Sequence, residues 1–162
     1  MISFNPSDLI IDNIWLGNYA AAENIKELKD KGIKKVLTLM DFGGPYYLEQ
    51  DGFVHKRYNI EDFDSQNILQ YFGECLHFMK GEEKILVHCM AGASRSATIV
   101  IAYLMWTQKM DYEKAFQFVK DKRYIVYPNF GFRKQLQQFE KLLKENDYDI
   151  DKINFKEIKI EK

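Results

Sequence analysis

Residues 85–96 have the sequence ILVHCMAGASRS, and the apolar run ATIVIA follows directly at residues 97–102. The pattern predicts a short buried strand, then a tight loop of small residues, then an apolar helix. Where a loop leads from a strand into the N-terminus of a helix, successive backbone N–H groups point at one spot, and a phosphate binds there. The sequence therefore predicts a phosphate-binding loop between a central strand and a helix.

The side chains of this loop suit phosphoryl transfer. Cys89 lies where a helix N-terminus and a guanidinium favour the thiolate form of a cysteine, which is a nucleophile. Arg95 offers a planar fork of donors that can clamp two phosphoryl oxygens, and the Ser96 hydroxyl can stabilise a thiolate that leaves a phosphocysteine. His88 is expected to orient the loop rather than to act as a base, because an ionised thiol needs none. We expect the phosphate to contact the loop residues Met90, Ala91, Gly92, Ala93, Ser94 and Arg95.

The order His88-Cys89-x-x-Gly92-x-Ser94-Arg95-Ser96 resembles the signature of the cysteine-dependent protein tyrosine phosphatases, and the Ser-Arg-Ser ending before Ala102–Met105 is similar to their dual-specificity branch. The likeness runs from about Leu9 to Leu143 and includes Ile14–Asn18, Gly32–Leu37 and Pro128–Phe130. It implies a small atypical dual-specificity protein phosphatase with a catalytic domain only. Such an enzyme hydrolyses phosphotyrosine and phosphoserine or phosphothreonine monoesters of a protein substrate through a phosphocysteine, here on Cys89, without a metal or other cofactor.

Hydrolysis of a phosphate ester also needs a proton donor for the leaving oxygen. Two candidates, Asp62 and Asp64, follow the strand that we expect at residues 54–58. In the resembled family an aspartate follows this strand at the position of Asp62, so we assign the general acid to Asp62. Asp64 stays an alternative, and its other interpretation is a cap or first-turn acid for a helix that begins near Ser65.

Three residues near the last long helix complete the expected site. By resemblance, Asn129 is the asparagine whose side chain supports the phosphate loop, and after Pro128 it also suits a helix N-cap. The two roles are compatible. Tyr127 and Phe130 either line the entrance of the site or are core aromatics, and the sequence favours neither interpretation.

Length and composition indicate one packed domain. The chain has 162 residues, of which 46% are hydrophobic and 15% aromatic, enough for one substantial core. We expect the catalytic domain at residues 1–145 and a charged tail, docked or mobile, at residues 146–162. A net charge of −1 provides no general attraction to nucleic acid or acidic membranes, so neither is an expected partner. The oligomeric state is left open.

The two cysteines do not form a disulfide framework. A working thiol, with no signal peptide or long apolar span, indicates a reducing compartment: the cytoplasm, with the nucleus as a second location. Cys75 lies in an expected helix at residues 65–80, at a spacing typical of the core. A regulatory disulfide with Cys89 under oxidation is the alternative.

Strand-like and helix-like patterns alternate along the chain, which indicates an α/β fold. We expect a central mixed, mostly parallel sheet of four to five strands with helices on both faces, as the resemblance to protein tyrosine phosphatases also implies. Strands are expected at residues 10–16, 35–40, 54–58 and 84–88. Helices are expected at residues 20–31, 65–80, 96–108, 112–121 and 130–145, and Asp111 is the expected cap of the fourth helix.

Other functions are weighed against this one. Phosphoinositide phosphatases of similar sequence tend to carry lysines in the loop, where this chain has uncharged Met90, Ala91 and Ala93. The lack of basic excess disfavours an RNA triphosphatase. A non-catalytic phosphopeptide-binding module usually loses the nucleophile, whereas Cys89 is present. A sulfur-transfer or redox enzyme would leave Asp62 without a purpose. A phosphorylated protein therefore stays the expected substrate.

Overall fold

The sheet begins with a β-hairpin where the sequence predicts one strand at residues 10–16. The computed structural model describes residues 5–46 and 48–162. β1 (Ser7–Ile11) and β2 (Ile14–Gly17) pair antiparallel across a tight turn. Asp12 in this turn has a φ of 46°, a left-handed conformation that Asp tolerates better than most residues. The prediction of one strand is therefore wrong, because Asp12 and Asn13 form a turn that divides the apolar segment into two strands.

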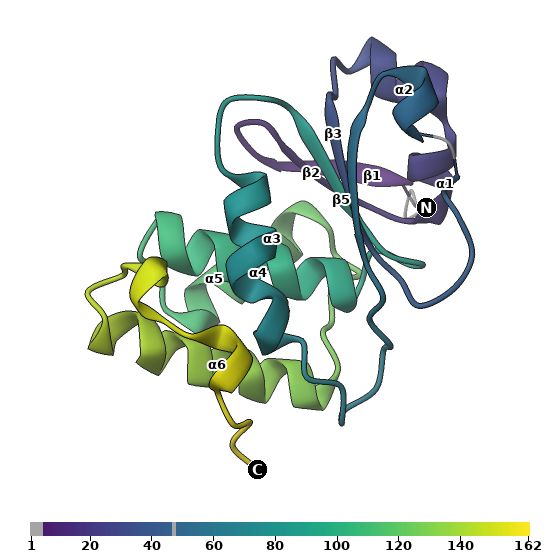
Figure 1. Ribbon diagram of the computed structural model, residues 1–162. Helices are drawn as coiled ribbons and strands as arrows, with labels where there is room; N and C mark the ends of the chain where they lie inside the picture. Colours follow the sequence, from purple (N-terminus) through teal and green to yellow (C-terminus); the bar gives the residue numbers. More distant parts are fainter. Residues whose placement is uncertain (1–4, 47) are drawn as a thin grey trace.

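Five strands of the described chain form one sheet in the order β1-β2-β5-β3-β4 (Figure 1). β3 (Lys35–Leu39), β4 (Val54–Tyr58) and β5 (Ile85–His88) run parallel to one another and to β2. β5 lies in the middle, and all four of its residues are buried, as is typical of a parallel strand covered on both faces. The mixed, mostly parallel sheet that the sequence predicts is confirmed.

Two short helices, α1 (Tyr19–Glu23) and α2 (Ile25–Asp30), lie on one face of the sheet. The sequence predicts a single helix over residues 20–31, but Asn24 interrupts it. The backbone of Asn24 leaves the helical region, and its side-chain oxygen accepts a hydrogen bond from Glu27 N at 3.2 Å. Asn24 therefore ends α1 and caps α2, as asparagine commonly does at a helix N-terminus.

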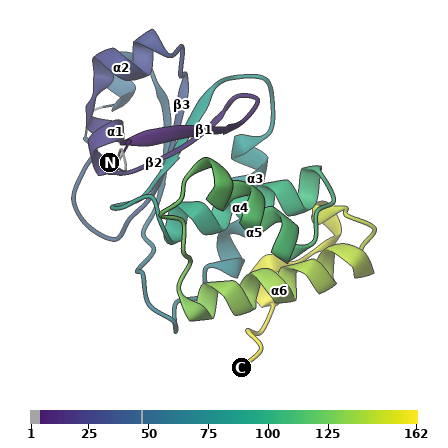
Figure 2. The ribbon, with the colours of Figure 1, turned by 180° about the vertical axis from the view of Figure 1, so that it is seen from behind.

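Four longer helices lie on the other face, over the larger part of the core (Figures 1 and 2). They are α3 (Phe72–Met79), α4 (Arg95–Thr107), α5 (Tyr112–Lys122) and α6 (Phe130–Glu145). α4 is buried over most of its length because it packs against the sheet and against α3, α5 and α6. Asp111 caps α5 as predicted, since its side chain accepts a hydrogen bond from Lys114 N at 2.8 Å. Of the described helices, none is long and apolar enough to cross a membrane.

α3 begins later than the helix that the sequence predicts over residues 65–80. A single 3₁₀ turn (Leu69–Tyr71) precedes it, and residues 65–68 are not helical. The side-chain oxygen of Gln135 on α6 accepts hydrogen bonds from Ile68 N and Leu69 N, both at 3.0 Å. A partner 66 residues or more along the chain thus fixes this start, which a local pattern does not reveal.

The chain after α6 packs back onto the same core. It forms two 3₁₀ turns, η3 (Ile150–Lys152) and η4 (Phe155–Glu157), beside α3 and α6 in Figure 1. The Phe155 ring lies over Gly73 of α3, where a Cβ would come within 2.8 Å of the ring. Three apolar side chains of the segment after α6 are buried: Ile150, Ile153 and Phe155. This part of the tail is docked.

Candidate active site

The loop between β5 and α4 turns its carbonyl groups outward, where other segments bind them. The Met90 oxygen accepts a hydrogen bond from Tyr19 N at 3.1 Å, and the Ala93 oxygen accepts one from Tyr127 N at 2.8 Å. Within the described part of the chain, the N–H groups of residues 90–94 have no hydrogen-bond partner. A loop whose carbonyl groups are bound by other segments and whose N–H groups are unpaired can bind an oxyanion through those N–H groups.

Gly92 lies in the middle of this loop. Its φ is +69°, a conformation that glycine adopts without strain. A Cβ at this position would lie 2.5 Å from the backbone oxygen of Gly17 at the end of β2. The absence of a side chain at Gly92 therefore lets the loop lie directly against the neighbouring strand.

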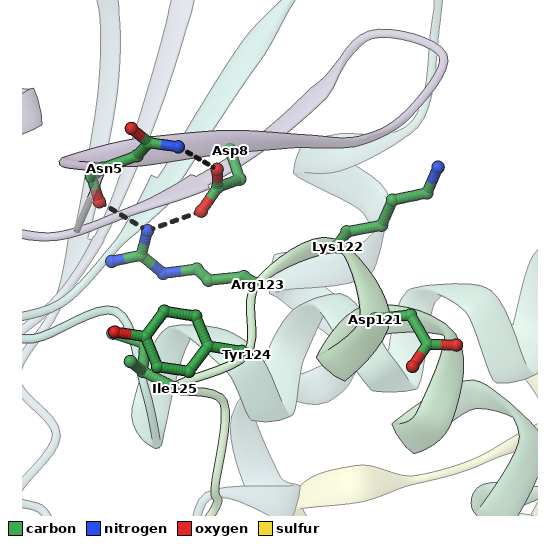
Figure 3. Close-up of a pocket in the computed structure, with 7 residues that line it drawn as sticks. All are labelled: Asn5, Asp8, Asp121, Lys122, Arg123, Tyr124 and Ile125. Atoms are coloured by element: carbon green, nitrogen blue, oxygen red, sulfur yellow. Dashed lines mark hydrogen bonds and ion pairs between the residues drawn. The ribbon is translucent and has the colours of Figure 1, made fainter. Parts of the chain in front are cut away.

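Arg123, which follows α5, binds two further carbonyls of the loop. Its Nε donates to the Gly92 oxygen at 3.0 Å, and its Nη2 donates to the Ala91 oxygen at 3.1 Å. Its Nη1 donates to the Asn5 oxygen and to Asp8 Oδ2, both at 2.8 Å, as Figure 3 shows. The guanidinium is buried, so one planar group joins the N-terminal segment to the outer side of the phosphate loop.

Cys89 directly follows β5, and Arg95 and Ser96 begin α4 at the other end of the loop. Cys89 Sγ is 3.0 Å from the hydroxyl of Ser96, and both residues are buried. Arg95 Nη1 donates to Asp41 Oδ1 and to the Ile60 oxygen, both at 2.9 Å. Among the described residues, nothing binds the buried Nε of Arg95. An unpaired buried donor costs about 1–3 kcal/mol, so the site favours a ligand that accepts this hydrogen bond.

A hydrogen-bonded chain runs from the loop through His88 and Thr38 to His55 on β4. The Cys89 oxygen can only accept, so His88 Nδ1, 3.2 Å away, is assigned the proton, and Nε2 is left as an acceptor. The Thr38 hydroxyl then donates to His88 Nε2 at 2.7 Å and accepts from His55 Nε2 at 2.8 Å. Glu49 Oε1 lies 3.4 Å from His55 Nδ1. Burial lowers the pKa of His88 to about 4, which keeps its ring neutral, as this arrangement requires.

Of the two candidate acids, Asp62 is the one that contacts the phosphate loop. Its Oδ1 accepts hydrogen bonds from Ser94 Oγ at 2.7 Å and from Asn129 Nδ2 at 2.9 Å. Asp64 instead faces the start of α6, where its Oδ1 accepts from Gly131 N at 3.4 Å. A Cβ at Gly131 would collide with the backbone oxygen of Asp64, so the two segments are in direct contact. The interpretation of Asp64 as a cap for a helix beginning near residue 65 is wrong.

Asn129 caps α6 as expected, whereas its side-chain amide binds Asp62 rather than the phosphate loop. Its side-chain oxygen accepts from Phe132 N at 2.8 Å and so caps α6, while its side-chain amide donates to Asp62. Its backbone N–H donates to Ser94 Oγ at 3.0 Å. The start of α6, the loop and the Asp62 segment are thereby joined through one residue.

Comparison with known proteins assigns this geometry to a family. The model of the dual specificity phosphatase catalytic domain matches residues 14–142. The chain belongs to the dual specificity phosphatases. Dual specificity protein phosphatase 1 of Arabidopsis thaliana is 39% identical over 147 residues, which cover 88% of this chain and 73% of that relative. MAP kinase phosphatase with leucine-rich repeats protein 1 of Dictyostelium discoideum is 44% identical over 137 residues, 83% of this chain but 16% of that protein.

Solved structures agree with this membership. The human tyrosine phosphatase-like serine/threonine/tyrosine-interacting protein has a TM-score of 0.79 at 33% identity, over 85% of this chain and 97% of that one. Human DUSP28 has a TM-score of 0.80 at 28% identity, over 86% of this chain and 96% of that one. The chain is thus an enzyme with the protein tyrosine phosphatase-like fold, and the expectation of a dual-specificity phosphatase is confirmed.

Several polar residues that surround the candidate active site were not predicted from the sequence. They are Asp41, Thr38, His55 and Arg123. Thr38, Asp41 and Arg123 bind the loop or a residue beside it, and His55 binds Thr38. All four come from other segments of the chain, so no local spacing identifies them. Among the described residues, no cluster of three or more His, Cys, Asp or Glu side chains could hold a metal ion.

Three aromatic side chains are exposed beside the phosphate loop. Phe63 is 62% exposed, Tyr127 59% and Phe130 57%. Tyr127 donates its N–H to the loop, and Phe63 and Phe130 each follow a residue of the hydrogen-bonded pair formed by Asp62 and Asn129. The interpretation of Tyr127 and Phe130 as core aromatics is therefore wrong.

Proposed function

We propose that this protein phosphatase hydrolyses phosphotyrosine and phosphoserine or phosphothreonine in protein substrates through a phosphocysteine on Cys89. The observation that carries the proposal is the loop, in which unpaired N–H groups at residues 90–94 follow a buried thiol. Donors fixed in this way stabilise the charge that develops on a phosphoryl group during transfer. The small side chains of Ala91 and Ala93 leave the loop open to both aryl and alkyl phosphates.

In the first step, the Cys89 thiolate attacks phosphorus. The S–P bond forms while the bond from phosphorus to the ester oxygen breaks, and the loop N–H groups and Arg95 Nε bind the phosphoryl oxygens. Asp62, protonated at the start, gives its proton to the departing ester oxygen. The hydrogen bonds from Ser94 and Asn129 hold the Asp62 carboxyl group beside the loop.

In the second step, water attacks the phosphorus of the phosphocysteine. The Asp62 carboxylate, now without its proton, takes one from the attacking water, and the S–P bond breaks. The Ser96 hydroxyl, 3.0 Å from Cys89 Sγ, donates to the departing thiolate. Inorganic phosphate leaves, and Cys89 and Asp62 regain their initial states. Because the cycle needs a free thiolate, we also propose that the enzyme works in a reducing compartment such as the cytoplasm or the nucleus.

Turnover of an aryl phosphate by matched cysteine variants tests the proposal. Cys89→Ser should lower kcat by about a thousandfold or more, since a hydroxyl at this site is a far weaker nucleophile, and should still bind a phosphopeptide. Cys75→Ser is the control, because this second thiol lies buried in the core on α3. Vanadate should inhibit the wild type, and a chelator should not.

Two results would contradict the mechanism. A Cys89→Ser protein that turned over normally would exclude the nucleophile. A wild-type protein that bound phosphopeptides but released no phosphate would indicate a phosphopeptide-binding module instead of an active enzyme.

A further inference from the structure

A second pocket, of about 360 Å³, lies beside the phosphate loop between α5 and α6. Tyr112 and Phe116 line it from α5, and Arg133 and Lys134 line it from α6. The remaining wall includes the exposed aromatics Tyr127 and Phe130. We call this site the basic-aromatic pocket.

The basic-aromatic pocket and the phosphate loop share a wall. The N–H of Tyr127 binds the Ala93 oxygen in the loop, and Asn129, next to Phe130, binds Asp62. An extended peptide advances about 3.3 Å per residue. A substrate whose phosphorylated residue lies in the loop therefore has neighbouring residues within reach of this pocket.

Arg133 is the residue that gives the pocket its chemistry. Its guanidinium carbon lies 4.9 Å from the centre of the Tyr127 ring and 5.7 Å from that of Phe130. Its Nε is buried, and no group in the described chain accepts a hydrogen bond from it. Ring contacts hold a guanidinium by its face and leave its N–H donors in the plane for a ligand.

The charges that line the pocket favour an anion. Lys134 Nζ lies 5.3 Å from the centre of the Phe130 ring, beside Arg133, and neither cation forms an ion pair with a carboxylate among the described residues. Glu113 is the one acidic residue of the lining. Two cationic side chains and one carboxylate therefore line the pocket, although the whole chain has a net charge of −1.

We propose that the basic-aromatic pocket is a specificity site that binds a second anionic side chain of the substrate, a phosphoryl group or a carboxylate, close to the phosphorylated residue in the loop. This inference rests on the proposed function, because it needs a peptide bound through a phosphate at Cys89. Arg133 makes the bidentate contact, and Lys134 adds a second positive charge.

Three peptides that differ at one position test the proposal. Each carries the same phosphotyrosine, and the position two residues away is phosphoserine, glutamate or alanine. For the wild type, we expect kcat/KM for at least one anionic peptide to exceed that for the alanine peptide by about tenfold, as one charge-assisted contact allows. Comparison of phosphoserine with glutamate shows which anion the pocket prefers.

Arg133→Met keeps the aliphatic stem and removes the charge. It should bring the ratio of anionic to alanine peptide to within about twofold of unity. Lys141→Met is the matched control on the same helix, since Lys141 is exposed and pairs with Glu161 outside the pocket, and it should keep the wild-type ratio. Arg133→Glu should favour a peptide with lysine at the same position.

The proposal would be overturned if the wild type showed no preference for either anionic peptide, or if Arg133→Met kept the preference. Binding of the same peptides to Cys89→Ser, measured by calorimetry, separates this result from failure of the proposed function. An anionic preference in binding, with no turnover by the wild type, would support the pocket and reject the catalytic mechanism.

Discussion

Thr38 Oγ1 lies 2.7 Å from His88 Nε2, so a hydroxyl of β3 binds the ring of the residue that ends β5 and precedes Cys89. Thr38 and His88 are partners in the register of the two parallel strands, which places their side chains together. Because His88 binds the Cys89 oxygen in turn, this contact connects the middle of the sheet to the start of the phosphate loop.

Thr38→Val removes the hydroxyl but keeps the shape of the side chain. The acceptor on His88 and the donor on His55 then lose their partner, so the free energy of unfolding should fall by about 2 kcal/mol. We also expect kcat for an aryl phosphate to fall about tenfold, with KM nearly constant, because the loop is less well fixed. Chemical denaturation and steady-state kinetics check this.

Thr38→Ser is the control that should retain kcat. A normal kcat in folded Thr38→Val would show that the hydrogen-bonded chain does not position the loop.

Asp62→Asn should slow hydrolysis most for substrates with a poor leaving group. An alkyl phosphate needs the proton, and its kcat/KM should fall about a hundredfold, whereas an activated aryl phosphate should lose much less. Steady-state rates over a series of leaving groups measure the difference. Asp64→Asn makes the same chemical change two residues away, next to α6 instead of the loop. A larger loss in Asp64→Asn than in Asp62→Asn would mean that the acid is misassigned.

Stability should fall on mild acidification because His88 is buried in the neutral state. Its pKa is about 4 in the folded protein and near 6.5 in the unfolded chain, so between these values the unfolded state binds more protons. Each pH unit in this window lowers the free energy of unfolding by about 1.4 kcal/mol, or about 2 kcal/mol from pH 6.5 to pH 5. His55, whose pKa burial also lowers, acts in the same direction.

Urea denaturation at several pH values measures this dependence. His88→Asn should show a shallower decline than the wild type between pH 6.5 and pH 5, because it removes the group that titrates. An equal decline in both proteins would mean that another group is responsible.

The two thiols should differ in reactivity. Burial raises the pKa of Cys75, which therefore stays protonated and reacts slowly in the folded protein. At pH 8, iodoacetamide should modify Cys89 first and Cys75 only after unfolding. Peptide mapping after mild peroxide treatment should find Cys89 oxidised and Cys75 free, and a Cys75–Cys89 disulfide would instead establish a redox switch.

Local sequence made the loop at the centre of the proposed site predictable. Cys89, Arg95 and Ser96 belong to one continuous run, in which a strand, a loop and a helix follow one another. The sheet class follows from the same alternation of apolar segments, and the five-stranded mixed sheet agrees with it. What these features share is that each depends on residues close together in the chain.

Long-range contacts made the rest unpredictable. Arg123 binds loop carbonyls 31 and 32 residues away, and Asp41 binds Arg95 across 54 residues. The late start of α3 depends in the same way on Gln135. Asn24 is different, because it splits α1 from α2 by a local capping interaction that an apolar periodicity alone overlooks.

The direct contact between Gly131 and the Asp64 backbone has a consequence for motion during the catalytic cycle. The segment that carries Asp62 is held against α6 and Ser94, so we expect it to stay beside the loop during turnover rather than swing away like a hinged flap. Turnover then depends on bond making and breaking, and a viscous solvent such as concentrated sucrose should leave kcat almost unchanged.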